Sequence, residues 1–193
     1  MQRGSGRYQR DRRNDMDRLD LLRHYFRSLH AELLRAYTGI TTEQLHWRPS
    51  EKANSMAFVG WHCARTEDNI INFVVQRKGT IWMEQGWDKR LGLDSRAQGT
   101  GMSAEESGNI KFPSPQVAVE YFSVVFTNTE RFLDSMSDAD LDRPTRIRRQ
   151  PLMQPEEPPL WEIVTTNLLM HEYSHAGELW VLRGLQGLTG AAF

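Results

Sequence analysis

Apolar residues recur every three or four positions along several segments of the chain, and this spacing lines one face of an α-helix. Helices are therefore predicted over residues 17–37, 56–78, 115–136 and 160–183. No alternating β pattern holds for long and no internal repeat is present. The sequence thus predicts an all-α protein whose four principal helices pack as a bundle. The pattern is clearest in the first helix, at Leu19, Leu22, Phe26, Leu29, Leu33 and Ala36.

Capping residues mark the boundaries of these helices. Ser114 followed by Pro115 is a favoured helix start, and Asn54 or Ser55 is expected to cap the second helix. The second and third helices are joined by a long crossover, rich in glycine and without a sustained period. Within it, the S-x-x-E pattern of Ser103–Glu106 predicts a short helix of its own.

Length and charge limit the domain organisation and the partners. A chain of 193 residues with 39% hydrophobic positions fits one domain, which we assign to residues 16–193. Residues 1–15 are rich in arginine and poor in apolar side chains, which predicts a disordered basic arm. The formal net charge of −1 provides no general attraction to nucleic acid. No apolar run approaches the length that a bilayer requires, so we expect no membrane partner.

The cysteine content and the N-terminal residues indicate the cellular compartment in which the protein is expected. The single cysteine, Cys63, excludes an intrachain disulfide, and no secretory signal follows the first methionine. A reducing, cytoplasmic location is therefore expected.

Three histidines occupy positions that the helical period assigns to the core. His171 and His175 are four residues apart, so they project from one face of the fourth helix and can bind the same ion. His62 lies on the apolar stripe of the second helix. The alternative is that each is a separate core histidine with its own hydrogen bond. The other three histidines fall off the stripes, in a loop or at a stripe's edge, and are predicted to have surface roles: His24, His30 and His46.

A site made of His62, His171 and His175 has a defined chemistry. Three neutral imidazoles suit divalent zinc, nickel, iron or copper and leave a coordination position open for water or substrate, as in catalytic metal sites. Cys63 lies about 100° around the helix from His62, so packing is its expected role. Glu178, one turn beyond His175, is either a further ligand, a partner of a ligand, or part of a surface ion pair.

Two motifs carry a resemblance to a known family. With WHCARTEDN in the second helix and HEYSHAGEL in the fourth, residues 17–185 resemble the DinB-like metal-binding four-helix bundles. Bacillithiol- and mycothiol-dependent transferases belong to this family. The resemblance implies an up-down-down-up bundle, a divalent metal on His62, His171 and His175, homodimerisation, and a low-molecular-weight thiol as cosubstrate.

The motif H-E-x-x-H, formed by His171, Glu172 and His175, also suggests a zinc peptidase in which Glu172 is the general base. The metzincin extension is absent, and Glu178 is the last carboxylate residue of the chain, so a third ligand is hard to supply.

We therefore favour a metal-dependent thiol S-transferase that acts on a small-molecule substrate. A non-enzymatic, stress-related metal-binding or dimeric bundle is the main alternative. Nucleic-acid binding through the arm and residues 143–149 ranks last.

Overall fold

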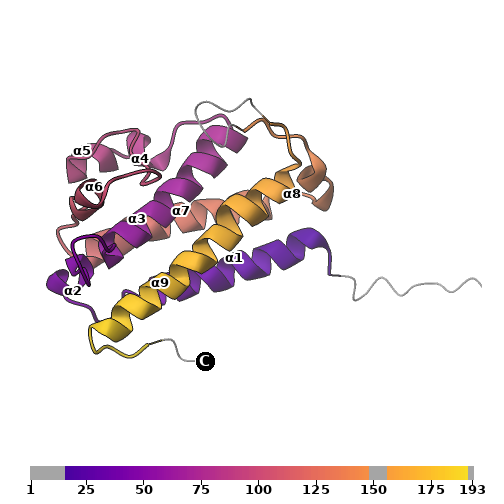
Figure 1. Cartoon of the computed structure of the whole chain (residues 1–193). Coiled ribbons are helices and arrows are strands. Elements are labelled where there is room, and N and C mark those ends of the chain that lie inside the picture. Colours follow the sequence, from indigo (N-terminus) through magenta and orange to yellow (C-terminus); the bar gives the residue numbers. More distant parts are fainter. Residues whose placement is uncertain (1–15, 148–155, 191–193) are drawn as a thin grey trace, which may run out of the picture.

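The structure is a computed structural model of the chain, and it describes residues 16–147 and 156–190 (Figure 1). The predicted basic arm, residues 1–15, lies outside these ranges. Within them, the regular elements are helical apart from isolated bridge pairs, so the all-α prediction is confirmed. In chain order the elements are α1 (Arg18–Arg35), α2 (Thr42–His46), α3 (Met56–Asp68), the π-helix η2 (Asn69–Val75), α4 (Ile81–Glu84), α5 (Trp87–Leu91), α6 (Ala104–Gly108), α7 (Pro115–Asp134), the 3-10 helix η3 (Asp138–Asp142), α8 (Leu160–Glu162), the π-helix η4 (Ile163–Met170) and α9 (His171–Leu185).

Side-chain caps fix the starts of the helices where the sequence predicts them. Ser55 accepts a hydrogen bond from the backbone N–H of Phe58 at 3.2 Å and begins α3. Ser114 caps α7, with Pro115 as its first helical residue. The capping box of Ser103 and Glu106 begins α6 and is also confirmed. Each cap satisfies a backbone N–H that the first helical turn leaves without a partner.

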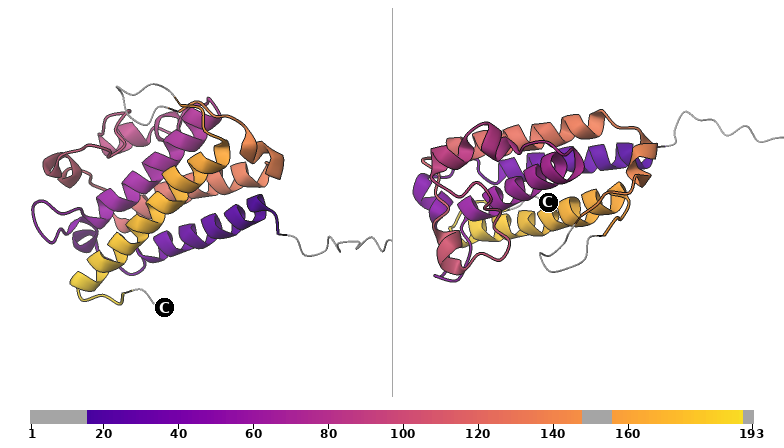
Figure 2. Two further views of the ribbon diagram at one scale, coloured as in Figure 1. Left: turned by 45° about the vertical axis from the view of Figure 1, so that its right-hand side comes forward. Right: turned by 90° about the horizontal axis from the view of Figure 1, so that it is seen from above.

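The longest helical segments of the described residues are α1, α3 with η2, α7, and α8 with η4 and α9. Both α3 and α1 pack against α7 and α9, and the turned views of Figure 2 show these segments side by side. Arg18 at the start of α1 pairs with Asp138, beyond the end of α7, at 2.7 Å. Tyr37, just beyond the end of α1, packs edge-on against Phe122 of α7, with ring centroids 5.3 Å apart.

The helix α3 is buried on nearly all sides, which the predicted single apolar stripe did not anticipate. The polar side chains of Arg65, Glu67 and Asp68 are among its buried residues. In the other direction, the helical period that puts His62 and Ile70 on the apolar stripe also predicts that Phe73 faces the core, but this residue is 58% exposed. It lies in η2, whose wider π-helical turn breaks the α-helical phase, so that Ile71 and Val75 face inward instead.

The crossover between η2 and α7 is fastened to α3 by buried polar groups. The carboxylate of Asp68 accepts hydrogen bonds from the backbone N–H groups of Ile81 and Trp82, at 2.8 and 2.9 Å. The guanidinium of Arg65 donates to the carbonyl of Ala97 at 2.9 Å. These contacts place residues 97–99 beside the middle of α3, where His62 lies.

The connection after α7 is rich in proline and arginine, and this composition predicts an exposed, partly extended linker. Its described part contains η3 and backbone bridges that join Pro144 to Pro159 and Ile147 to Glu156. Leu141 and Ile147 are buried, so this segment also covers one end of the core. Among the described residues, no helix is both long and apolar enough to cross a bilayer.

Candidate metal site

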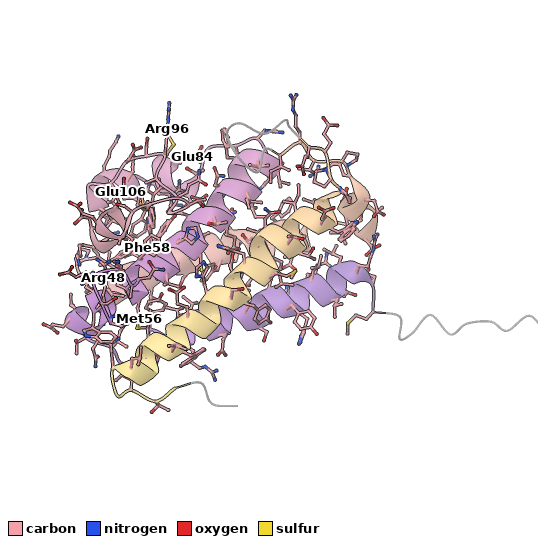
Figure 3. The ribbon with its side chains drawn as sticks, in the orientation of Figure 1. Arg48, Met56, Phe58, Glu84, Arg96 and Glu106 are labelled. Atoms are coloured by element: carbon pink, nitrogen blue, oxygen red, sulfur yellow. The ribbon has the colours of Figure 1, made fainter. Side chains whose placement is uncertain are left out.

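The structure brings together the three histidines that the sequence singles out. His62 projects from α3, and His171 and His175 project from the first turns of α9. The Nε2 atom of His171 lies 3.1 Å from Nε2 of His62 and 3.1 Å from Nε2 of His175. The stacked ring of Phe58, one helical turn before His62, marks this side of α3 in Figure 3. Three ring nitrogens of the same kind therefore face one point between α3 and α9.

Hydrogen bonds on the outer side of two rings orient them toward this point. Nδ1 of His62 lies 2.5 Å from the carbonyl oxygen of Gln98, and Nδ1 of His175 lies 2.8 Å from a carboxylate oxygen of Glu178. Both partners are acceptors, so each Nδ1 carries the proton and each Nε2 presents a lone pair. The amide of Asn54 donates to the other oxygen of Glu178 at 2.9 Å and holds it in place. The partner reading of Glu178 therefore fits, and its carboxylate binds the outer face of His175.

The local environment favours the neutral form of His62 and His171. Burial lowers the pKa of His62, and the same effect, together with the charges that His175 and His62 would carry, lowers the pKa of His171 to about 4. The hydrogen bond from His175 lowers the pKa of Glu178, which therefore remains a carboxylate. Neutral histidines with convergent lone pairs are the donor set that divalent transition ions prefer. The residues present therefore fit such an ion.

Solvent can reach the three nitrogens. A cleft of about 470 Å³ between α3, α6 and α9 is lined by all three histidines, Phe58 and Met102. A larger cleft of about 890 Å³ reaches His171 from the side of η2. The smaller cleft therefore gives a small molecule access to all three histidines, and the larger one gives access to His171.

Gly99 forms part of the wall next to His62. Its φ of +92° lies in the left-handed region, and a Cβ atom there would be 2.5 Å from Nδ1 of His62. Only glycine allows the Gln98 carbonyl and the imidazole to approach this closely. The sequence did not single out Gln98 or Gly99, because the crossover has no period from which their positions could be predicted.

Cys63 does not belong to the three-histidine group. Its side chain is fully buried in the core, and burial raises the pKa of its thiol well above the ordinary value. A protonated, enclosed thiol packs as an apolar side chain.

The prediction of a surface role for His30 is wrong. The residue is 2% exposed, because α1 is covered by both α7 and α9 and its buried face is wider than the apolar stripe. Burial by itself lowers the pKa of His30, but the charge of Glu67 and the hydrogen bond with Glu130 outweigh this effect and raise the pKa to about 10. The predicted surface position of His24 is confirmed, because this residue is exposed. His46 is only half-buried, but it accepts a hydrogen bond from the backbone N–H of Phe112 at 3.1 Å.

Glu172 is turned away from the three-histidine group. It is completely buried, and its carboxylate lies near His30 and Glu67 in the bundle core. Burial, followed by the charge of Glu67, raises its pKa well above the ordinary value. A zinc peptidase would need this glutamate beside the water that it activates, so the geometry does not favour that reading of H-E-x-x-H.

Comparisons with known proteins agree with this fold. A protein from Enterococcus faecalis described as a conserved protein is 17% identical, with a TM-score of 0.75, over 89% of this chain and 98% of that one. A DinB-like protein from Bacillus cereus is 18% identical, with a TM-score of 0.55, over 88% of this chain and 95% of that one. A protein from Streptococcus pneumoniae is 11% identical, with a TM-score of 0.55, over 92% and 94%.

These structural likenesses concern the fold alone. A search of curated proteins finds no match. Residues 18–179 match the sequence family described as the DinB superfamily, and this match covers most of the chain. The chain therefore belongs to the DinB superfamily.

Proposed function

We propose that the protein binds one divalent metal ion through Nε2 of His62, His171 and His175. The observation that carries this proposal is the convergence of the three nitrogens, with the outer nitrogens of His62 and His175 held by a carbonyl and a carboxylate. A proton on Nε2 of His171 can be shared with only one of the two neighbouring lone pairs at a time, whereas one cation accepts all three lone pairs. Zinc, nickel and iron all suit three imidazoles with an open position.

The activity that this site supports best is transfer of a low-molecular-weight thiol to an electrophilic small molecule. A bound divalent ion would supply Lewis acidity, which lowers the pKa of a thiol or of water at neutral pH. The two clefts give the cosubstrates separate access to the histidines. His62 is held by Gln98 and His175 by Glu178, so the donors are oriented before any ligand arrives.

The proposal includes a four-helix bundle with up-down-down-up helix directions, a homodimer and a cytoplasmic location. These directions are supported by contacts between the start of α1 and the segment after α7, and between α3 and α9. The dimer and the location rest on the family resemblance and on the composition.

A non-enzymatic metal-binding bundle is the alternative function, and it needs the same three histidines. The two are separated by a panel of low-molecular-weight thiols with an electrophilic acceptor. Loss of free thiol that requires both the protein and its metal supports the transferase. A protein that is fully loaded with metal but has no activity on the panel supports the non-enzymatic bundle.

The metal proposal itself is tested by the metal content of the purified full chain, beside His62→Ala, His171→Ala and the control His24→Ala, whose side chain is exposed. We expect at least one ion per chain in the wild type and the same content in the control. We expect each ligand variant to contain one ion per chain fewer than the wild type. A metal content that is unchanged by either ligand substitution would refute a shared site.

A further inference from the structure

A second group of metal-ligating side chains lies in the bundle core. It consists of His30 from α1, Glu67 from α3 and Glu172 from α9. One donor atom from each residue lies within 4.8 Å of the others. The three residues are 2%, 0% and 0% exposed, respectively, so water does not solvate their charges.

The carboxylates of this group lack the partners that buried charges require. Among the described residues, neither oxygen of Glu67 nor of Glu172 has a hydrogen-bond partner. Oxygen Oε1 of Glu67 lies 3.2 Å from Nε2 of His30, but the two atoms are not aligned as a hydrogen bond. Burying a carboxylate without a partner is strongly unfavourable, and buried polar groups are nearly always paired. The group therefore needs either protons or a cation between these side chains.

The ring of His30 is oriented as a metal ligand would be. Its Nδ1 lies 2.8 Å from a carboxylate oxygen of Glu130, which can only accept a hydrogen bond when ionised. Nδ1 then carries a proton, and Nε2 faces Glu67 and Glu172. Phe126 stacks on the ring at 4.4 Å and limits its rotation. A carboxylate that holds the outer nitrogen of a ligating histidine is the usual second layer of a metal site.

We propose that His30, Glu67 and Glu172 form a second, buried binding site for a divalent first-row transition ion. One such ion balances the two carboxylates and accepts the lone pair of Nε2. Protons on Nε2 of His30 and on Glu172 are the alternative to an ion, and a count of bound metal separates the two. Ligands from facing helices of a bundle commonly build sites of this carboxylate and histidine composition. Imidazole with two carboxylates suits zinc, iron or manganese.

This second site shares no ligand with the three-histidine site. His171 and Glu172 are neighbours in α9, and their side chains therefore leave the helix in directions about 100° apart. The three-histidine site opens to clefts, whereas the second group is enclosed. We therefore assign the second ion a structural role, in which it joins α1, α3 and α9.

The experiment counts metal ions in the full chain. Protein is unfolded with a chelator, refolded with excess zinc so that burial does not prevent loading, and desalted. The metal bound per chain is then measured by mass spectrometry. The samples are wild type, Glu67→Gln, His62→Ala, the double variant, and the control Glu120→Gln, which changes an exposed carboxylate on α7. Circular dichroism checks that each sample is folded.

We expect two ions per chain in wild type and control, one in each single variant, and none in the double variant. A single ion in the wild type that is lost in His62→Ala and kept in Glu67→Gln would overturn the second site alone. A single ion that is lost in Glu67→Gln and kept in His62→Ala would overturn the three-histidine site alone. If Glu67→Gln does not fold, the metal content of His62→Ala is the test. One ion retained in this variant supports the second site, and the absence of any ion overturns it.

Discussion

Replacing Gly99 by alanine should weaken metal binding at the three-histidine site through contact with His62. A Cβ atom at Gly99 would lie 2.5 Å from Nδ1 and 3.0 Å from Cγ of this histidine. The imidazole or the crossover must then move, and the hydrogen bond to the carbonyl of Gln98 is lost or lengthened. Loss of such an outer partner typically lowers metal affinity about 10–100-fold. This corresponds to about 1.4–2.7 kcal/mol of binding free energy.

Gly101→Ala provides the matched control. Gly101 also has a positive φ, +78°, but a Cβ atom there would have no neighbour within 4 Å. Both alanines suffer backbone strain of about 1–2 kcal/mol in the left-handed region. Each kcal/mol lowers the melting temperature of a chain of this size by about 2–4 °C. Only Gly99→Ala should also lose affinity for metal.

Competition with a chromophoric chelator measures the affinity, and thermal unfolding measures the strain. A metal affinity of Gly99→Ala equal to that of the wild type would refute the proposed contact between residue 99 and His62. An equal loss of affinity in both variants would also refute it, because the loss would then follow from backbone strain.

Three further outcomes follow from the structure. Glu178→Gln should lower metal affinity about 10-fold or more, because the amide binds Nδ1–H of His175 less strongly; an unchanged affinity by chelator competition would contradict this. Because the folded-state pKa of His171 is lowered to about 4, protein stripped of metal should lose stability as the pH falls from about 6.5 to 4. Urea unfolding across this range tests that slope, and His171→Asn should flatten it. Gly60→Ala should destabilise the fold by about 1–3 kcal/mol despite the higher helix propensity of alanine, because its Cβ would meet the ring of Phe122 at 2.6 Å. A gain in urea stability would show that the neighbouring ring can give way.

The helical elements were predictable because their signals are local. Apolar spacing predicted α1 and α7, and the cap Ser114 set the start of α7 to the residue. The start of α3 was predicted to within one residue, at Asn54 or Ser55, and Ser55 is the cap. The burial of α3 on all sides was not predictable, because it depends on which helices surround it. A single stripe therefore underestimated its core, and the π-helical turn of η2 moved Phe73 out of it.

The three-histidine site was predictable for a related reason. His62, His171 and His175 interrupt apolar stripes, and an imidazole on such a stripe requires a common explanation. The group of His30, Glu67 and Glu172 was missed because glutamates are normally assigned to the surface. A signal existed in the fourth helix, where Leu168, Glu172 and Ala176 follow one another in steps of four.

The most direct test of the central claim is anomalous diffraction at the metal edge from crystals of the full chain loaded with zinc. The account predicts an anomalous peak within about 2.0–2.2 Å of Nε2 of His62, His171 and His175. A well-ordered triad with no peak between its nitrogens, in crystals of protein shown to contain zinc, would contradict it.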